Sequence, residues 1–180
     1  MIKRITVVLV FLATLIVVLY IRGRISLLTE GHLQTNQSSR LGDAWLYPPE
    51  STPGAVDAAV SQDNIQQTIC ISGYTARVRP PTGFTNRLKR ELMEENKLPG
   101  EPSDYELDHV IPLELGGCGD CLTNLWMEPL THPGAHEKDR VENYLHRAVC
   151  DGQITLADAQ MAIAQDWYSL YLSFATNSLR

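Results

Sequence analysis

The sequence has no excess of positive charge, no internal repeat and only four cysteines. Its 15 Lys and Arg against 21 Asp and Glu give a net charge of -6, so the molecule as a whole has no general attraction for a nucleic-acid backbone. Any binding of nucleic acid would need a local patch or a metal. Nothing resembles a recognition helix or a zinc-finger array, which argues against sequence-specific reading of DNA. A length of 180 residues, 44% of them hydrophobic, excludes a multidomain machine, a collagen-like fibre and a fully disordered chain.

A long apolar run near the N-terminus, residues 5–21, contains no charged residue. As a helix this run spans roughly 25 Å, enough to cross the hydrocarbon core of a bilayer. Basic residues flank it on both sides, and the terminal amine favours a cytoplasmic N-terminus with the rest of the chain exported. A cleaved signal peptide is the alternative, but no small-x-small cleavage site follows the run. We therefore expect residues 1–24 to anchor the chain in a membrane, with the remainder on the periplasmic or extracellular face, or secreted if the anchor is cleaved.

All four cysteines follow the apolar run, in a part of the chain expected to meet an oxidising compartment. The two-residue spacing between Cys118 and Cys121 favours a small local disulfide ring, which leaves Cys70 to pair with Cys150 as a long-range link. A four-cysteine zinc site is one alternative, although a second Cys-x-x-Cys pair is lacking. A redox-active pair is another, although these two cysteines lie in a glycine-rich loop rather than at the start of a helix.

Residues 25–66 show no sustained helical or strand period, which predicts a flexible tether. Such a tether would reach on the order of 35 Å, and its Trp45-Leu46-Tyr47 cluster can dock on the folded part. The folded domain is then expected over 67–180. Its predicted elements form an α+β fold: a β segment at 68–71, an extended segment at 77–79, a helix at 85–97, an extended stretch at 105–115, a returning strand at 124–127, a helix at 135–149 and a last helix that starts at Thr155 with Asp158 as a partial capping box.

An adjacent aspartate and histidine, Asp108 and His109, lie in the predicted extended stretch. Neighbouring residues of a strand point to opposite faces, so the two side chains suit different tasks rather than symmetrical binding of one ion. An aspartate is a hard oxygen ligand for a cation such as Mg²⁺, and a histidine titrates near neutral pH, as a general base must. In isolation such a pair is an ordinary surface turn, so the residues around it decide its interpretation.

The run that contains this pair resembles the motif of HNH endonucleases, and it reads Asp108-His109-x-x-Pro112-Leu113-x-x-Gly116-Gly117, followed by Asn124-Leu125. The wider resemblance, to small exported bacterial proteins of that family, covers roughly residues 68–170. It implies a ββα-metal core, a hairpin followed by a helix, with flanking helices. It also implies hydrolysis of DNA phosphodiester bonds with little sequence specificity and one divalent metal, Mg²⁺ or Mn²⁺, with Zn²⁺ as an alternative.

The resemblance also assigns roles to individual residues. Asp108 matches the carboxylate that binds the metal, and His109 matches the general base that deprotonates a water. Asn124 matches the middle letter of the motif, which braces the loop and orients the base. The third letter lies early in the helix, where His136 falls within the predicted first turn and is the expected second metal ligand. The alternatives are His132, which precedes a proline and would need a loop to reach, and the acidic residues Asp139 and Glu142.

Positive charge is concentrated ahead of the motif, because residues 69–97 carry six basic against three acidic side chains. Residues 98–126 hold six acidic residues and no Lys or Arg, so the hairpin would need metal before it tolerated DNA. Arg77 and Arg79 are expected to share one face of the predicted extended segment and to contact a phosphate, with Lys138 as a further contact. DNA and a membrane are the expected partners, and no protein partner is predicted. A non-catalytic exported binding domain on the same scaffold is the alternative function, and a thiol-redox role is a third.

Overall fold

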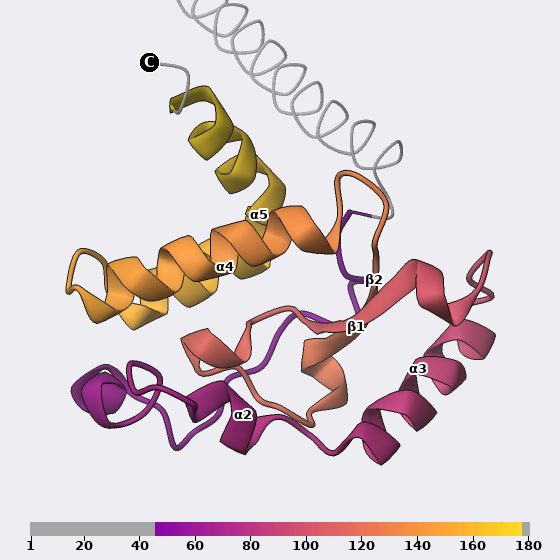
Figure 1. Cartoon of the computed structure of the whole chain (residues 1–180), viewed down its shortest axis with the longest axis horizontal. Helices are drawn as coiled ribbons and strands as arrows, with labels where there is room; N and C mark the ends of the chain where they lie inside the picture. Colours follow the sequence, from indigo (N-terminus) through magenta and orange to yellow (C-terminus); the bar gives the residue numbers. More distant parts are fainter. Residues whose placement is uncertain (1–45, 178–180) are drawn as a thin grey trace, which may run out of the picture. The chain divides into compact units, whose positions relative to one another are not determined.

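The structure of the chain is a computed structural model that describes residues 46–177, with side chains as far as Ser173 (Figure 1). The predicted membrane segment, 1–24, lies outside the described residues, as does the first part of the predicted tether, 25–45. Both stay predictions. None of the helices within the described range is both long and apolar enough to cross a bilayer.

Helices and one short hairpin make up the described part of the chain, so the fold is α+β as predicted (Figure 1). The hairpin and the helix that follows it come in the predicted order. The elements are α2 (Tyr74–Val78), α3 (Thr82–Glu95), β1 (Tyr105–His109), β2 (Leu125–Pro129), α4 (Ala135–Cys150) and α5 (Leu156–Asn177), with short 3₁₀ turns at Gln62–Gln67, Pro102–Asp104, Leu113–Leu115 and Leu122–Asn124.

The predicted cap of α5 is present in the structure. Thr155 Oγ1 donates to Asp158 Oδ2 (2.7 Å), and the backbone nitrogen of Asp158 donates to Thr155 Oγ1 (3.1 Å). The helix then bends at Asp166, whose backbone is not helical (φ -163°, ψ 73°). The carboxylate of Asp166 accepts from the backbone nitrogen of Ser169 (3.0 Å), so it caps the second half of α5 as an N-cap residue does.

Strands β1 and β2 are antiparallel, and their register places each side chain on one of two faces. Glu106 lies opposite Glu128, Asp108 opposite Trp126 and His109 opposite Leu125. Because directly paired residues share a face, Glu106, Asp108 and Glu128 lie on one face and His109 lies on the other. A two-stranded hairpin is marginally stable on its own. The support comes from α3, where Lys89 Nζ donates to the backbone oxygen of Tyr105 (2.5 Å), and from α4.

The hydrophobic core lies between α4, α5 and the segments that cross them, and not under the sheet. Trp167 and Ile163 of α5 and Val141 of α4 are each at most 1% exposed. The buried members of this core are Ile65, Ile69, Tyr74, Ile111, Leu115, Val141, Leu145, Val149, Leu156, Ala159, Ile163 and Trp167. The hairpin is therefore attached to the edge of a helical core.

Residues 46–66, predicted to be part of a flexible tether, pack on this core instead. Trp167 Nε1 donates to the backbone oxygen of Leu46 (2.7 Å), and the Tyr47 hydroxyl donates to Asp166 Oδ1 (2.8 Å). Further along, Val60 packs against the core and Ile65 is buried within it. The folded domain thus begins before residue 67, which corrects the predicted boundary. The segment lacks a period of its own because tertiary contacts, rather than regular secondary structure, fix its path.

Two predicted extended segments are also corrected. Residues 68–71 form turns rather than a β segment, and Arg77 and Val78 form the end of α2, so that within 77–79 only Arg79 is extended. Ile69 and Tyr74 are both in the core, and only four residues separate them. A compact turn brings both inward, whereas a strand here would need a partner that the two-stranded sheet does not offer.

The four cysteines form the two predicted disulfides, Cys70–Cys150 and Cys118–Cys121. The first joins the turns before α2 to the end of α4 across 80 residues of sequence, and the second closes a ring across three. All four sulfurs are thereby used, so the alternative of a four-cysteine zinc site is not formed in this structure.

Removal of the long-range disulfide is expected to destabilise the domain far more than removal of the local one. A disulfide stabilises mainly by restricting the unfolded chain, and the restriction grows with the length of the closed loop. The Cys70→Ser, Cys150→Ser double variant should lose roughly 2–5 kcal/mol of unfolding free energy. Urea denaturation followed by tryptophan fluorescence measures the loss, with the Cys118→Ser, Cys121→Ser double variant as the matched control. Equal losses in the two double variants would contradict the prediction.

Candidate functional site

Three carboxylates share one face of the hairpin, and α4 supplies the groups opposite them. Glu106 and Asp108 lie on β1, and Glu128 lies on β2 directly opposite Glu106. Lys138 and Glu142 lie one turn apart on α4. Glu128 is 0% exposed and Lys138 is 2% exposed. We call Lys138, Asp108, Glu128 and Glu142 the Lys138 cluster, and it joins the hairpin to α4.

The ammonium of Lys138 is the centre of this cluster. Its Nζ donates to Asp108 Oδ2 (2.5 Å), to the backbone oxygen of His109 (2.8 Å) and to Glu142 Oε1, and it lies 4.0 Å from Glu128 Oε2. Burial alone would lower the pKa of Lys138, but the three carboxylates outweigh burial and raise that pKa well above its usual value. Lys138 was predicted to contact a phosphate, and its burial corrects this. The spacing of four residues between Lys138 and Glu142 is typical of surface ion pairs and of buried ion pairs alike. The spacing alone therefore could not reveal that Lys138 is buried.

The carboxylates of the Lys138 cluster do not all ionise at neutral pH. Burial raises the pKa of Asp108, but Lys138 outweighs this effect and lowers the pKa to about 2. Burial raises the pKa of Glu142 to about 8 and the pKa of Glu128 well above its usual value, because one ammonium cannot compensate three buried anions. Within the described residues no donor reaches either oxygen of an ionised Glu128, whereas protonated Glu128 can donate to Asp108. The cluster therefore contains the ion pair of Lys138 with Asp108, and the raised pKa values of Glu142 and Glu128 favour the protonated forms of both acids.

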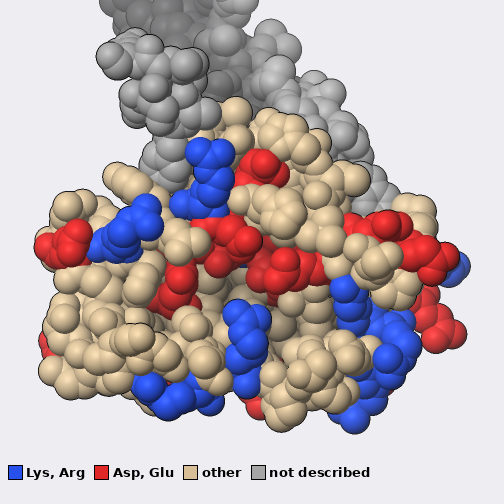
Figure 2. All heavy atoms as spheres, viewed as in Figure 1, with Lys and Arg blue, Asp and Glu red and all other residues tan. Residues whose placement is uncertain are grey.

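A second acidic group, which we call the outer acids, consists of Glu106, Asp108 and Asp139. Burial raises the pKa of Glu106, and the nearby Asp108 and Asp139 raise it further. Burial and then Asp108 raise the pKa of Asp139, while Lys138 and His136 oppose this shift. Asp139 is exposed, so the group opens to solvent. Figure 2 shows acidic side chains in a band across this face of the molecule, with basic side chains gathered over α3 at the lower right.

The predicted metal ligands Asp108 and His136 lie on elements that meet, but they do not form a ready-made site. His136 is exposed on the first turn of α4. Among the described residues, two sets of three ligand atoms lie within 4.8 Å of one another, and neither set contains Asp108 or His136. The assignment of these two residues to a metal stays a prediction. The other early histidine, His132, contacts Glu137 Oε1 through its Nδ1 (2.7 Å) and is 75% exposed at its side chain.

His109 lies on the opposite face of β1 from the acids and is 5% exposed. Its Nε2 is 3.0 Å from the backbone oxygen of Gly119. A carbonyl oxygen only accepts, so Nε2 must carry the hydrogen, and Nδ1 of the neutral ring is then an acceptor. Burial lowers the pKa of His109, although the bond to Gly119 and the charge of Asp108 oppose the shift. His109 is therefore a neutral imidazole with an acceptor nitrogen, which is the state that a general base needs.

Asn124 fixes the loop that positions Gly119. Its Oδ1 accepts from the backbone nitrogens of Ile111 (2.9 Å) and Ala55 (3.1 Å), and its Nδ2 donates to the backbone oxygens of Ile111 (3.0 Å) and Cys118 (2.9 Å). Gly117 is needed beside it, because a Cβ there would lie 1.8 Å from the Ile111 oxygen and 3.0 Å from Asn124 Nδ2. Asn124 thus holds the backbone on both sides of the loop without touching the His109 ring itself.

The predicted substrate contacts Arg77 and Arg79 do not share a face. Arg77 lies within α2 and packs over the ring of Tyr74 at 5.8 Å. Arg79 follows the last residue of α2 in an extended conformation (φ -63°, ψ 131°) and lines a cavity beside Gly119. Arg79 also acts electrostatically on His109, Glu106 and Asp139. Of the two arginines, Arg79 is the one at the site.

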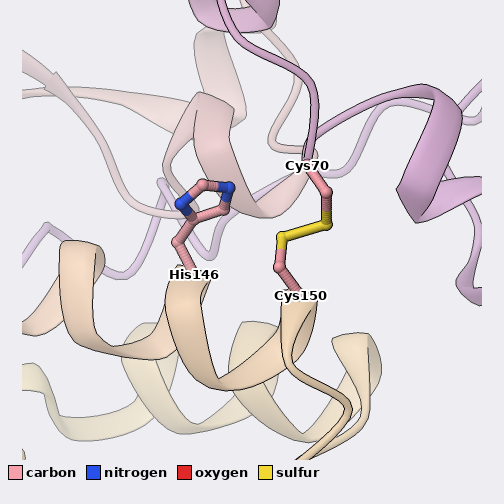
Figure 3. Close-up of side chains that lie close together, drawn as sticks. All are labelled: Cys70, His146 and Cys150. Atoms are coloured by element: carbon pink, nitrogen blue, oxygen red, sulfur yellow. A yellow bond between two sulfur atoms is a disulfide. The ribbon is translucent and has the colours of Figure 1, made fainter.

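Figure 3 shows His146 beside the disulfide Cys70–Cys150, which joins the turns before α2 to the end of α4. His146 Nε2 contacts the backbone oxygen of Ile69 (3.0 Å), so the histidine and the disulfide both attach the turns before α2 to α4. Cys70, His146 and Cys150 form one of the two sets of close ligand atoms, and Cys118, Asp120 and Cys121 form the other. Because the sulfurs in both sets are bonded to each other, these sets serve as structural links in this state.

Comparisons with models of known protein families, with characterised proteins and with solved structures find no match to this chain. The chemistry must therefore be inferred from the geometry, which offers a neutral imidazole, a group of carboxylates and an arginine around the end of β1. Sequence reasoning missed Glu106, Glu128 and Gly119. A single glutamate within the apolar run 125–130 was the available signal for a buried acid at Glu128.

The Glu142→Gln variant is expected to flatten the pH dependence of stability in metal-free buffer. Because the pKa of Glu142 is raised to about 8, the folded protein keeps a proton that the unfolded chain has released. The free energy of unfolding should therefore fall with rising pH, by up to about 1.4 kcal/mol per pH unit from this group. Glutamine keeps the acceptor oxygen for Lys138 and cannot ionise, so the part of the fall that comes from Glu142 should disappear and the slope should become smaller.

Urea denaturation at a series of pH values between about 5 and 8, with EDTA present, tests this linkage. Glu91→Gln on α3 is the matched control, because Glu91 forms an exposed pair with Arg87 (3.6 Å). It should leave the pH dependence unchanged. A Glu142→Gln variant that keeps the same slope as the original protein would contradict the prediction.

Proposed function

We propose that this protein is a metal-dependent endonuclease of the HNH type, which hydrolyses phosphodiester bonds of DNA with little sequence preference. The observation that carries the proposal is the state of His109, a buried neutral imidazole whose Nε2 is occupied by the Gly119 oxygen. Its Nδ1 is thereby the proton acceptor. The order of hairpin and helix, β1, β2 and then α4, supports the same proposal, as does the adjacency of His109 to Asp108.

A divalent cation fits the donor set around Asp108. The outer acids and the Lys138 cluster contain more carboxylates than the ammonium of Lys138 can balance, so the site holds an excess of negative charge unless protons or a cation neutralise it. Carboxylate oxygens suit Mg²⁺ or Mn²⁺ better than Zn²⁺. Oδ2 of Asp108 accepts from Lys138, and protonated Glu128 is able to donate to the same carboxylate, so a cation that binds Asp108 would replace the proton of Glu128. Glu106, Asp139 and His136 would supply further ligands after their side chains reorient.

Each part of the site then has a task in the hydrolysis. Nδ1 of His109 accepts the proton of the attacking water, while the Gly119 oxygen keeps the ring in position. Lys138 keeps Asp108 ionised and in place, as a positioning residue. Arg79 contacts the phosphate from the open side. A bound divalent cation would neutralise the charge that develops on the phosphate and on the leaving oxygen.

The proposal includes a location. Two disulfides are typical of a compartment that is oxidising, so they support export of the domain to the periplasmic or extracellular face, with residues 1–24 in the membrane. A non-catalytic exported binding domain is the second candidate function. The observation that favours it is the ion pair of Lys138 with Asp108, which occupies one oxygen of the carboxylate that would bind the metal.

Plasmid nicking separates the two candidates. The full chain, purified in detergent micelles, should nick supercoiled DNA with Mg²⁺ or Mn²⁺, and EDTA should abolish the reaction. His109→Ala should reduce the rate by roughly 10²- to 10⁴-fold, the usual contribution of a general base. His132→Ala is the matched control, because this histidine is exposed and should leave the rate unchanged. A folded protein whose nicking survives His109→Ala would refute the assignment, and no nicking with any metal would favour the binding domain.

The pH profile of the same reaction should show a base with a lowered pKa. His109 acts in its neutral form, and its pKa lies below the ordinary value of 6.5. The rate should therefore stay on its plateau through neutral pH and fall only when the pH drops below the ordinary histidine range. A rate that already halves above pH 6.5 would show that burial does not control the base.

The Cys118–Cys121 ring is expected to support the base, because it encloses Gly119. The Cys118→Ser, Cys121→Ser double variant frees the loop that carries the Gly119 oxygen, so the His109 ring loses its fixed orientation. We expect the nicking rate to fall by roughly 10- to 100-fold, as misplacement of a catalytic group does. The Cys70→Ser, Cys150→Ser variant, assayed at a temperature where it stays folded, should keep its rate. Equal rates for the two double variants would contradict the prediction.

A further inference from the structure

A cavity of about 430 Å³ opens beside the base, and the proposed hydrolysis does not use it. The carbonyl of Gly119 that accepts from His109 belongs to a residue of the cavity wall, and Arg79 belongs to the same wall. The cavity therefore shares with the proposed site the residue that orients the His109 ring and the arginine that is proposed to contact the phosphate. Its volume is at the lower end of the range for small-molecule sites, roughly 300–1,000 Å³, and it admits a group no larger than about one nucleoside.

The lining of this cavity combines three kinds of side chain. Phe84, with Pro80 and Pro81 beside it, offers apolar surface. Asp57 and Asp120 offer carboxylates, which only accept hydrogen bonds when ionised. Arg79 offers a cation that is able to bind a phosphate. A ligand that matches this lining has a flat ring for the apolar surface, hydrogen-bond donors on the edge of the ring for the carboxylates, and a phosphate for Arg79.

Cations outside the cavity are placed to hold the rest of a strand. Arg87 lies over the Phe84 ring at 5.9 Å, and Arg90 is exposed one turn further along α3. Both residues lie on α3, over which Figure 2 shows basic side chains gathered. A single strand that passes the cavity would thus meet positive charge on α3, whereas the band of acidic side chains would repel it.

We propose that this cavity binds one unpaired nucleobase of the strand whose phosphate lies at His109. The base stacks on Phe84 and directs its edge donors to the carboxylates of Asp57 and Asp120, while Arg79 contacts its phosphate. A base that is paired and stacked in a duplex cannot enter, so the substrate is single-stranded or frayed nucleic acid. The inference rests on the proposed function for the position of the strand and adds to it the class of substrate.

Binding without cleavage tests the cavity separately from the hydrolysis. The full chain in detergent micelles, with EDTA present, is titrated with a fluorescent single strand of abasic deoxyribose-phosphate residues that carries one central guanine, because guanine has two adjacent donors on its pairing edge. A second probe has an abasic residue in place of the guanine. Phe84→Leu should weaken binding of the guanine probe by roughly five- to a hundredfold, as the loss of one stacked base does.

The abasic probe decides what that loss means. The original protein should bind the abasic probe about as weakly as Phe84→Leu binds the guanine probe. Phe84→Leu and the original protein should bind the abasic probe equally well. Tyr144→Leu on α4 is the matched aromatic control and should change neither affinity. Equal weakening of both probes by Phe84→Leu, or weakening of neither, would overturn the inference.

Cleavage of the guanine probe and of plasmid DNA with Mg²⁺ or Mn²⁺ supplies an independent readout. If binding of the guanine probe depends on Phe84 but no metal supports cleavage of either DNA, the cavity stands as a base-binding site and the proposed hydrolysis fails. If the protein nicks DNA through His109 but Phe84→Leu leaves the affinity for both probes unchanged, the hydrolysis stands and the cavity inference fails. The far-UV circular dichroism of Phe84→Leu should match that of the original protein, because leucine is a good helix former at this half-buried position in α3.

Discussion

The rest of the site depends on the hydrogen bonds and ion pairs that the buried ammonium of Lys138 makes. The ammonium binds the side chain of Asp108 and the backbone of His109, two consecutive residues at the end of β1, and it binds Glu142 on its own helix. The hairpin thereby acquires a fixed position on α4, which a two-stranded sheet could not keep by its own hydrogen bonds. Loss of this one cation would leave several carboxylates facing one another in a buried space, and a single uncompensated buried charge already costs about 3–5 kcal/mol.

The second half of the loop between the strands, residues 116–124, is held by hydrogen bonds and a disulfide, whereas its first half packs into the core through Ile111 and Leu115. Asn124 bonds to the backbone at Ile111 and at Cys118, and the Cys118–Cys121 disulfide closes the loop around Gly119. Residues 116–124 include one large apolar side chain, Leu122, and it is 64% exposed, so covalent and polar links replace a core there. As a result the His109 ring is oriented by a main-chain carbonyl whose position depends on two independent constraints, which makes the acceptor nitrogen less sensitive to changes in side chains nearby.

Local features of the sequence predicted the elements that local interactions determine. The hairpin, α4, the Thr155–Asp158 cap and both disulfide pairs follow from alternation, helical spacing, capping chemistry and cysteine spacing, and each is present. The errors concern residues whose structure depends on distant partners. Leu46 and Tyr47 are fixed by α5, which is more than a hundred residues away, and Lys138 is buried only because β1 brings Asp108 to it. Composition and spacing contain no information about such partners. The roles of His109 and Asp108 stay predictions, because geometry alone does not measure catalysis.

The two faces of β1 separate two electrostatic requirements that conflict. In the proposed hydrolysis Asp108 would have to stay ionised to attract a cation, whereas His109, the next residue, would have to stay neutral to accept a proton. An anion beside an imidazole raises the pKa of that imidazole, and Asp108 does so here. The alternation of the strand turns Asp108 towards Lys138, whose charge balances it, and turns His109 into a buried environment that lowers its pKa.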